Sequence, residues 1–226
     1  MSPQCILFTF LLRTTSESDK TCETMKTCIA IILFIHFLAT NAKFTWKNCA
    51  PEDAILHVNN VEVGPDPIVV PGDITLTMDG NSTAPLGSSA LHISLKRKTF
   101  LGEIPIPCIS NIGSCTYKDL CTLVGQMIRE NWLGITTGIA TQIQTMLANT
   151  GIDASQCPQP AQSLRIDHQS IHLPEVPAAL SYFAAGDYHA HIFLTDNTSN
   201  KVHLCIDAFF TITEKEPCTG ILCIFG

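Results

Sequence analysis

Short runs of alternating apolar and polar residues recur along the chain from residue 74 onward. Residues 74–79 alternate before the turn-forming triplet at 79–81, and residues 91–96 alternate again. A period of two is typical of a strand with one apolar face, because successive side chains of a strand point to opposite sides. Both runs are therefore predicted to be strands.

The clearest pair of predicted strands comes late in the chain. Residues 187–195 and 201–212 both alternate, and the turn-forming residues 196–200 lie between them. This pattern predicts a long antiparallel hairpin, in which a central turn near Thr198 would place His191 opposite Cys205. Several short strands separated by turns, without alternating helices, predict an all-β fold. A two-sheet, immunoglobulin-like sandwich and an open β-cup both fit this pattern.

Helical periodicity is confined to one stretch in the middle of the chain. Leucine, valine and isoleucine recur at helical spacing at 120–128 and again, every four residues, at 135–147. Two short helices are therefore predicted as an insertion at about 117–150. Residues 131–152 carry no charge, so the second helix, led by Trp132, fits three roles. It could cap an apolar pocket, touch a bilayer surface, or pack against the outside of a sheet.

The N-terminal region has the pattern of a secretory signal peptide at residues 25–42. A methionine and a lysine precede an uncharged apolar run, and small residues end at Ala42, where cleavage is predicted. A membrane anchor is the alternative, but a span needs about 20 apolar residues and this run breaks at Thr40. Residues 1–24 are then a non-native extension upstream of the true start.

Cysteine usage points to the same compartment. Removal of residues 1–42 takes away three of the 11 cysteines and leaves an even set, which permits complete disulfide pairing. Many cysteines without a Cys-x-x-Cys pair indicate an oxidising compartment. We therefore expect the secretory pathway, with the lysosome or the extracellular space as the destination. Two sequons, at Asn81 and Asn197, predict glycosylation in exposed turns.

Composition favours one folded domain and argues against nucleic acid as a partner. Hydrophobic residues make up 46% of the chain and charged residues only 15%, which excludes disorder. The formal net charge is -7 and no basic run is longer than residues 96–98, so an electrostatic footprint for nucleic acid is missing. No linker-like segment divides the chain. We expect a single domain at 43–214, followed by a tail at 215–226.

The sequence offers little to support catalysis. The nucleophile motif Gly-x-Ser-x-Gly is absent, and even pairing would leave no free thiol. His189, His191 and His203 share one face of the late hairpin, where solvated histidines are more common than a zinc site. No metal or cofactor is therefore predicted. Only Asp207 and Glu103 stand in apolar surroundings that suggest a raised pKa, as glycoside cleavage would need. A protein without enzymatic activity is the stronger interpretation.

Six motifs occur in a fixed order between residues 44 and 208. They are the segments at 44–49, 65–76 and 106–121, then Cys157-Pro158, then 186–188, then Leu204-Cys205-Ile206. In this order they closely resemble the ganglioside G(M2) activator family, which belongs to the lipid-recognition β-cup proteins. The resemblance implies two sheets around an apolar cavity that takes up the acyl chains of a lipid.

The resemblance also implies a function without chemistry of its own. Such a protein would touch a membrane surface transiently, extract a glycosphingolipid such as a ganglioside, and present it to a lysosomal glycosidase such as β-hexosaminidase. An extracellular β-sandwich that binds a protein and has no lipid cavity is the alternative.

Disulfide pairs and lipid-binding residues follow from the same resemblance. It implies the pairs Cys49–Cys205, Cys108–Cys115 and Cys121–Cys157, whereas Cys218 and Cys223 lack a family counterpart and are expected to close the tail. The family's fourth bridge and its exposed tryptophans are missing here, and two loops offer other apolar residues instead. The expected lipid-binding residues, from these loops, the strand faces and the insertion, are Leu76, Met78, Ile93, Leu95, Phe100, Leu101, Trp132, Leu180, Tyr182, Phe183, Tyr188, Ile192, Leu194, Leu204 and Ile206.

A cup of this kind must keep its sheets apart around a partly empty interior. A lipid with two chains hides roughly 30 methylenes from water, at about 0.8 kcal/mol each, so the interior must be equally dry. We expect disulfides to brace such an interior, and the Cys49–Cys205 bridge to stabilise most because it closes the longest loop. Alternation alone does not distinguish a hollow interior from a filled one.

Overall fold

The computed structural model describes residues 44–183 and 185–215, which lie in one compact unit, Ala42–Gly226. Several sequence predictions fall outside this part. They are the signal peptide (25–42), the upstream extension (1–24), the Cys218–Cys223 bridge, and the contacts expected of the Tyr182 and Phe183 side chains.

The larger sheet, sheet A, follows the strand order β1-β10-β9-β5-β6. β3 pairs with the end of β10 in parallel, β7 pairs with β5, and the other pairs of sheet A are antiparallel. The predicted late hairpin is β9–β10. The strands are β1 (Thr45–Asn48), β3 (Ile68–Val70), β5 (Ser89–Thr99), β6 (Gly102–Pro105), β7 (Thr116–Tyr117), β9 (Gly186–Asp196) and β10 (Val202–Glu214).

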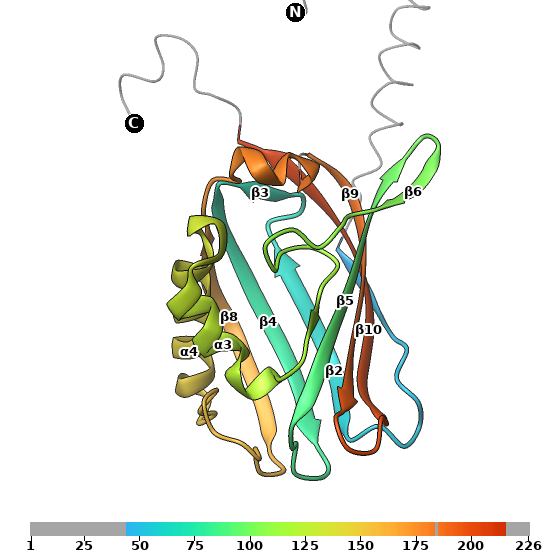
Figure 1. The fold of residues 1–226 in the computed structure, drawn as a ribbon, viewed down its shortest axis with the longest axis vertical. Helices are drawn as coiled ribbons and strands as arrows, with labels where there is room; N and C mark the ends of the chain where they lie inside the picture. The colour runs from blue at the N-terminus through green and yellow to red at the C-terminus, as the bar shows by residue number, and fades with distance from the viewer. Residues whose placement is uncertain (1–43, 184, 216–226) are drawn as a thin grey trace, which may run out of the picture. The chain divides into compact units, whose positions relative to one another are not determined.

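The smaller sheet, sheet B, contains β2, β4 and β8 in that order, all antiparallel. Sheets A and B form opposing walls of the domain (Figure 1). β3 belongs to sheet A and β4 to sheet B, so the chain crosses from one sheet to the other at Pro71. The strands are β2 (Leu56–Gly64), β4 (Gly72–Ser82) and β8 (Ser163–Leu173).

Two helices occupy the predicted insertion. Asp119 caps the first helix by accepting a hydrogen bond from the Cys121 N–H at 3.1 Å. The Thr136 hydroxyl accepts from the Trp132 N–H and donates to the Met127 carbonyl, which fixes the turn between the helices. The elements are α3 (Leu120–Glu130), the short η1 (Trp132–Gly134) and α4 (Thr136–Asn149).

The helices lie beside β8, where α4 packs against the strand (Figure 1). A further short helical turn, η2 (Ala178–Phe183), precedes β9. Within the described part of the chain, no helix is both long and apolar enough to cross a bilayer. The predicted two-sheet β architecture with a short helical insertion is thus confirmed.

Buried apolar side chains form two separate clusters, one on each sheet. The sheet A cluster contains Leu95, Ile106, Tyr188, Ala190 and Ala208. The sheet B cluster joins α4 to β8 and contains Met146, Ile166 and Ile171. A filled sandwich has one core shared by both inner faces. Two clusters therefore indicate that sheets A and B are not packed together along their whole length.

The register predicted for the late hairpin is wrong by two residues. His191 lies opposite Asp207, and Cys205 lies opposite Phe193. One residue of this difference arises in the turn, where Val202 already lies opposite Thr195, and the other is a register shift between Val202 and Leu204 at the start of β10. Because side chains alternate with a period of two, a shift of two residues leaves every side chain on the face predicted for it.

Candidate functional site

A cavity of about 280 Å³ lies between the sheets, at the end where β4 and β9 finish and β2 and β10 begin. Both sheets and the helical layer contribute to its wall. The sheets supply Leu56, Val58, Met78, Leu164, Leu194 and Leu204. The helices supply Leu120, Val124 and Leu147.

The wall of this cavity is suited to an apolar ligand. None of the described residues that line it is Asp, Glu, Lys or Arg. Two of its glutamine side chains are already engaged: Gln159 Nε2 donates to the Gln156 carbonyl at 2.6 Å, and Gln162 Nε2 donates to Gln159 Oε1 at 3.3 Å. Because hydrocarbon offers no hydrogen-bond partners, a wall made mostly of apolar side chains and free of charge favours hydrocarbon as its occupant.

One disulfide forms part of the cavity wall. Cys121 lies in the first turn of α3 and Cys157 lies in the segment between α4 and β8. The same segment is joined to the β4–β5 connection by a pair of backbone hydrogen bonds between Leu86 and Gln159, both 2.9 Å long. A covalent bond and a backbone bridge therefore hold the helical layer against the cavity.

The other described bridges lie away from the cavity. Cys49–Cys205 joins the end of β1 to its neighbour β10 within sheet A, and Cys108–Cys115 closes the loop between β6 and β7. The structure thus forms the three pairs that the resemblance implies. No bridge in the described residues links sheet A to sheet B, and the bridge that braces the interior is Cys121–Cys157, which acts through the helical layer. The helical layer and the crossing at Pro71 connect the sheets instead.

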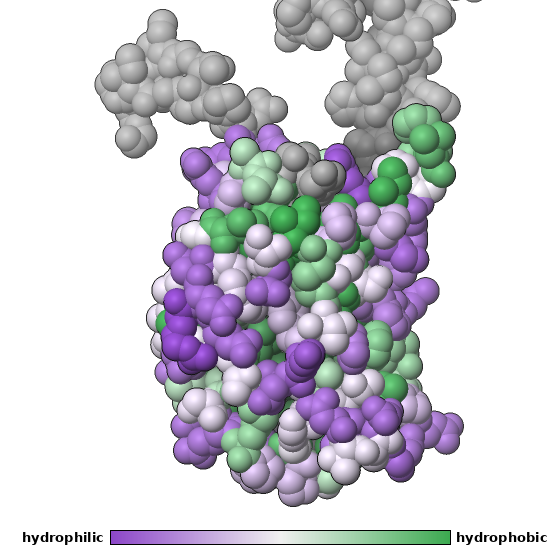
Figure 2. Space-filling model, viewed as in Figure 1, coloured by the Kyte–Doolittle hydropathy of each residue, from purple (hydrophilic) through white to green (hydrophobic). Residues whose placement is uncertain are grey.

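An exposed apolar tip lies at the other end of β5 from the cavity. Phe100 and Leu101 connect β5 to β6 and are 96% and 80% exposed. Leu91, near the start of β5, pairs with Leu194 of the cavity wall. Figure 2 shows apolar side chains on this protruding hairpin. Large apolar side chains exposed together mark a contact site, because water is a poor environment for them.

An ionic cluster centred on Asp207 lies on the outer face of sheet A, which is the face turned away from the cavity. His189 Nε2 and His191 Nδ1 each lie 3.0 Å from Asp207 Oδ1. Desolvation raises the pKa of Asp207, but the hydrogen bonds from the two histidines outweigh it and leave that pKa below its usual value. A hydrogen bond from Lys96 likewise lowers the pKa of Glu103. The raised pKa predicted for these two acids is therefore wrong, because both have donating partners.

A sulfur-rich site near this cluster is not suited to a metal. The ligand atoms of Cys49, Cys205 and His191 lie within 4.8 Å of one another. The two sulfurs form a disulfide, however, so neither is the thiolate that binds a metal.

Comparison with known proteins decides the family. The family model of the ML domain, E1_DerP2_DerF2, matches residues 43–212. The chain belongs to the ML-domain family. This result confirms the sequence resemblance at the level of the family, which comprises lipid-recognition domains.

Relatives of this ML domain include two curated proteins named Ganglioside GM2 activator. The Mus musculus protein is 30% identical over 86 residues and the Macaca fascicularis protein is 38% identical over 87 residues. Each match covers 38% of this chain and 45% of the relative, less than half its length. A crystal structure of a Niemann-Pick type C2 protein from Japanese carpenter ant has 10% identity and a TM-score of 0.39, and covers 75% of this chain and 99% of that chain.

The ML domain brings only some of the predicted lipid-binding residues to the cavity. Met78, Leu194 and Leu204 line it. A second group lies farther along the inner faces, in or beside the two apolar clusters: Leu76, Ile93, Leu95, Tyr188, Ile192 and Ile206. Leu180 is buried in η2, whereas Phe100 and Leu101 form the exposed hairpin tip.

Trp132 lies neither at the cavity nor on the surface. It is 8% exposed, and its ring stacks on Tyr117 with the centroids 5.7 Å apart. Its Nε1–H donates to the Glu130 carboxylate at 2.7 Å. This position gives Trp132 no access to a bilayer. Of the roles expected for the helix that follows, the cap over an apolar pocket fits, because Leu147 of α4 lines the cavity. Met146 of α4 packs with Ile166 of β8, which lies opposite the cavity-lining Met78, so α4 does not cover the outside of the sheet.

The two predicted glycosylation sites have different surroundings. Asn81 lies within β4, near its end, and forms part of the cavity wall, so the turn predicted at 79–81 and the exposed turn predicted for this sequon are wrong. Asn197 is exposed in the β9–β10 turn, where its Nδ2 donates to Ser88 Oγ and to the Lys118 carbonyl. Glycosylation at either residue stays a prediction.

Proposed function

We propose that this chain is a lipid-transfer protein without enzymatic activity. It acts in the secretory pathway, in the lysosome or outside the cell. It extracts a glycosphingolipid from a membrane and presents it to a lysosomal glycosidase such as β-hexosaminidase. The observation that carries this proposal is the apolar cavity between two separately packed sheets. The names of the curated relatives support a ganglioside as the lipid class.

The cavity replaces the apolar surroundings that a lipid chain loses when it leaves a bilayer. Each methylene exposed to water costs about 0.8 kcal/mol, so a carrier must offer a dry apolar surface of similar extent. Leucines from both sheets and both helices offer that surface at one end of the domain. The half-buried side chains of Ile192 and Ile206 continue it along sheet A.

The hairpin tip supplies the approach to the membrane. Phe100 and Leu101 can enter the interface between lipid headgroups and acyl chains without unfolding any part of the domain, because both are already exposed. The ML domain thus combines a surface that touches lipid with an interior that holds it.

A cavity-filling variant tests the proposal. Ala154 lines the cavity, and Ala154→Phe would occupy part of its volume. Ala148 is exposed on α4 and does not line the cavity, so Ala148→Phe is the matched control. The assay follows a fluorescent ganglioside as it leaves donor vesicles, with purified protein and no glycosidase present.

The proposal expects extraction by the wild type and by Ala148→Phe, with at least severalfold slower extraction by Ala154→Phe at an unchanged melting temperature. Equal extraction by all three proteins would place the lipid elsewhere. If the wild type extracts no lipid at all, a protein-binding sandwich becomes the better interpretation. Addition of β-hexosaminidase then tests presentation separately: faster hydrolysis of the vesicle-bound ganglioside is the expected result.

A further inference from the structure

We propose that Arg97 gives this ML domain its preference for lipids with an anionic headgroup. The guanidinium would bind a carboxylate or a phosphate group while the acyl chain occupies the interior. This inference rests on the proposed lipid-transfer function and names the headgroup chemistry that the same site accepts.

Arg97 points to the inner face of sheet A, although it is charged. In β5 it shares its face with Ile93 and Leu95, and it lies directly opposite Tyr188 of β9. Tyr188 is only 2% exposed. A Cβ added to Gly186 would lie 2.8 Å from Arg97 Nε, so the glycine leaves room for the guanidinium on this face.

The guanidinium has donors to spare. One terminal nitrogen donates to the Ala185 carbonyl. Among the described residues, no carboxylate forms an ion pair with Arg97, in contrast to Lys96, which pairs with Glu103 on the outer face at 3.1 Å. A guanidinium carries five N–H donors in a planar fork that fits the two oxygens of a carboxylate or phosphate. Arg97 is half-buried, so its remaining donors stay accessible to a ligand on this face.

The distance from the cavity suits a headgroup site. Leu91, which pairs with Leu194 of the cavity wall, lies six residues before Arg97 on β5. At about 3.4 Å per residue this is a path of about 20 Å along the inner face. One leaflet of a bilayer contains about 15 Å of hydrocarbon. An acyl chain of about this length with its end in the cavity covers most of this path, so its headgroup would lie on the Arg97 side of the inner face.

During extraction, the exposed hairpin tip places Arg97 near the headgroups of the membrane lipids. Phe100 follows Arg97 by three residues, which corresponds to about 10 Å of extended chain. If the tip enters the acyl region, Arg97 lies among the headgroups. The same residue can then meet the anionic group before and after the lipid leaves the bilayer.

A comparison of three probe lipids with identical acyl chains tests this inference. One carries a neutral oligosaccharide, one carries the same oligosaccharide with a sialic acid carboxylate, and one carries a phosphate monoester. Each is present as a fluorescent trace in vesicles of one constant composition, so the surface charge of the membrane does not change. The proteins are the wild type, Arg97→Gln and Arg97→Lys.

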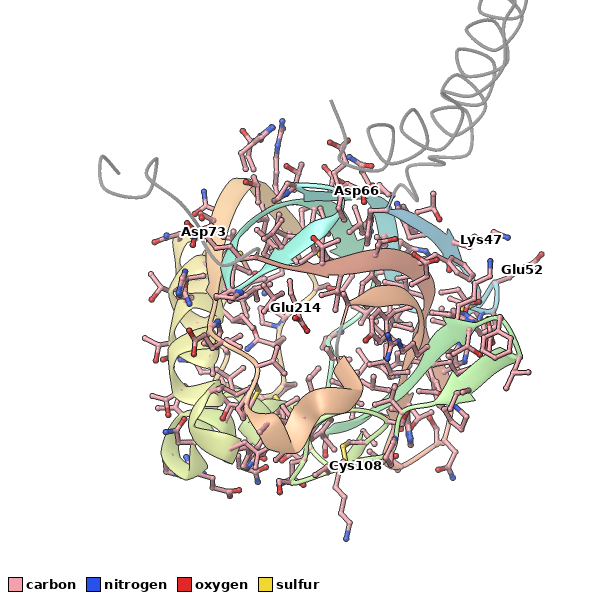
Figure 3. The ribbon with its side chains drawn as sticks, turned by 90° about the horizontal axis from the view of Figure 1, so that it is seen from above. Lys47, Glu52, Asp66, Asp73, Cys108 and Glu214 are labelled. Carbon is pink, nitrogen blue, oxygen red and sulfur yellow. A yellow bond between two sulfur atoms is a disulfide. The ribbon has the colours of Figure 1, made fainter. Side chains whose placement is uncertain are left out.

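Two charge controls accompany these variants. Lys98→Gln removes the same charge from the next residue of β5, whose side chain points to the opposite face. Glu214→Gln removes a negative charge at the end of β10, on the same strand face as Ile212; the Glu214 side chain is labelled near the middle of Figure 3, which views the domain from above. Neither control should reduce the preference for the anionic lipids.

Arg97→Gln should extract an anionic lipid about tenfold less well than the wild type, which corresponds to the loss of a charge-assisted hydrogen bond. Its extraction of the neutral lipid should not change. Arg97→Lys should keep part of the preference, because a lysine retains the charge but lacks the fork. The methyl ester of the sialylated lipid has no charged carboxylate. The wild type should therefore extract this ester about as poorly as Arg97→Gln extracts the free acid.

The outcomes separate this inference from the proposed function. Loss of preference for the sialylated lipid alone identifies a carboxylate as the ligand, and loss for the phosphate lipid alone identifies a phosphate. An equal decrease for the neutral and the anionic lipids, or no decrease for either anionic lipid, would overturn the role of Arg97. A wild type that extracts the neutral lipid but has no preference retains the transfer function and refutes only this inference.

Discussion

Charged side chains on sheet A have different partners on its two faces. On the outer face, Asp207 receives hydrogen bonds from His189 and His191, and Lys47 of β1 lies opposite it. On the inner face, the guanidinium of Arg97 donates a hydrogen bond to the Ala185 carbonyl. A charge that is satisfied within the fold contributes to stability, whereas one without a counterion remains available to a ligand.

Removal of the Asp207 charge should destabilise the fold in a pH-dependent way. The pKa of this carboxyl is lower in the folded state than in the unfolded state, so its contribution is present above about pH 4 and is lost as the pH falls through the lowered pKa. We expect Asp207→Asn to decrease the free energy of unfolding by about 1–2 kcal/mol at neutral pH, and by clearly less near pH 3. Urea denaturation at several pH values measures this difference.

An exposed acid provides the control for that measurement. Asp53 pairs with Lys201 at 3.2 Å, but both side chains are about two-thirds exposed. Surface pairs of this kind contribute little, so Asp53→Asn should change the free energy of unfolding by less than about 1 kcal/mol at every pH. A deficit of Asp207→Asn that is as large near pH 3 as at neutral pH would contradict the assigned hydrogen bonds.

At the scale of elements, β-bulges explain which strands the sequence pattern predicts. β4 keeps an unbroken alternation from Ile74 through Met78, and its pattern predicts the strand. Its neighbours β2 and β8 each contain a register shift, between Val58 and Asn60 in β2, and opposite the Leu76–Met78 step in β8. An extra residue in a strand shifts every later apolar side chain by one position in the sequence, so the alternation does not continue through the whole strand. The sequence pattern therefore missed Leu56, Val58 and Leu164 of the cavity wall.

The hairpin between β5 and β6 should govern vesicle binding independently of stability. Replacement of both Phe100 and Leu101 by serine should weaken vesicle binding about tenfold or more, because each apolar side chain gains roughly 1.5–3 kcal/mol when it leaves water. The melting temperature should not change, since both side chains are almost fully exposed. Vesicle flotation measures the binding.

A substitution away from the tip distinguishes insertion from a general surface effect. Ala148→Ser on α4 also replaces an exposed apolar residue with serine and should bind vesicles as the wild type does. If the double serine variant floats with vesicles as well as the wild type, the hairpin is not the membrane contact.

At the scale of the whole molecule, the alternation predicted the β fold and the helical insertion, whereas the three disulfide pairs and the cavity came from the family resemblance. Alternation reports which face of a strand is apolar and does not report what that face touches. Leu194 and Ala190 illustrate the difference: they are four residues apart on one face of β9, yet Leu194 lines the cavity and Ala190 is packed in the sheet A cluster. Only the three-dimensional spacing of the sheets separates these two roles.

The disulfides should divide into one that stabilises the chain and one that shapes the cavity. Cys49–Cys205 joins residues 156 positions apart, and Cys121–Cys157 joins residues 36 positions apart. In the chain-entropy account these loops correspond to about 5 and about 4 kcal/mol. Replacement of both cysteines of the first pair by alanine should therefore lower the melting temperature more than replacement of the second pair.

Replacement of the second pair should instead lower ganglioside extraction more, because Cys121 and Cys157 line the cavity and tie α3 to the segment before β8. Calorimetry and vesicle extraction, both at temperatures where the variants remain folded, measure the two effects. If extraction falls in proportion to lost stability in both variants, the Cys121–Cys157 bridge is an ordinary cross-link and has no special role in holding the cavity open.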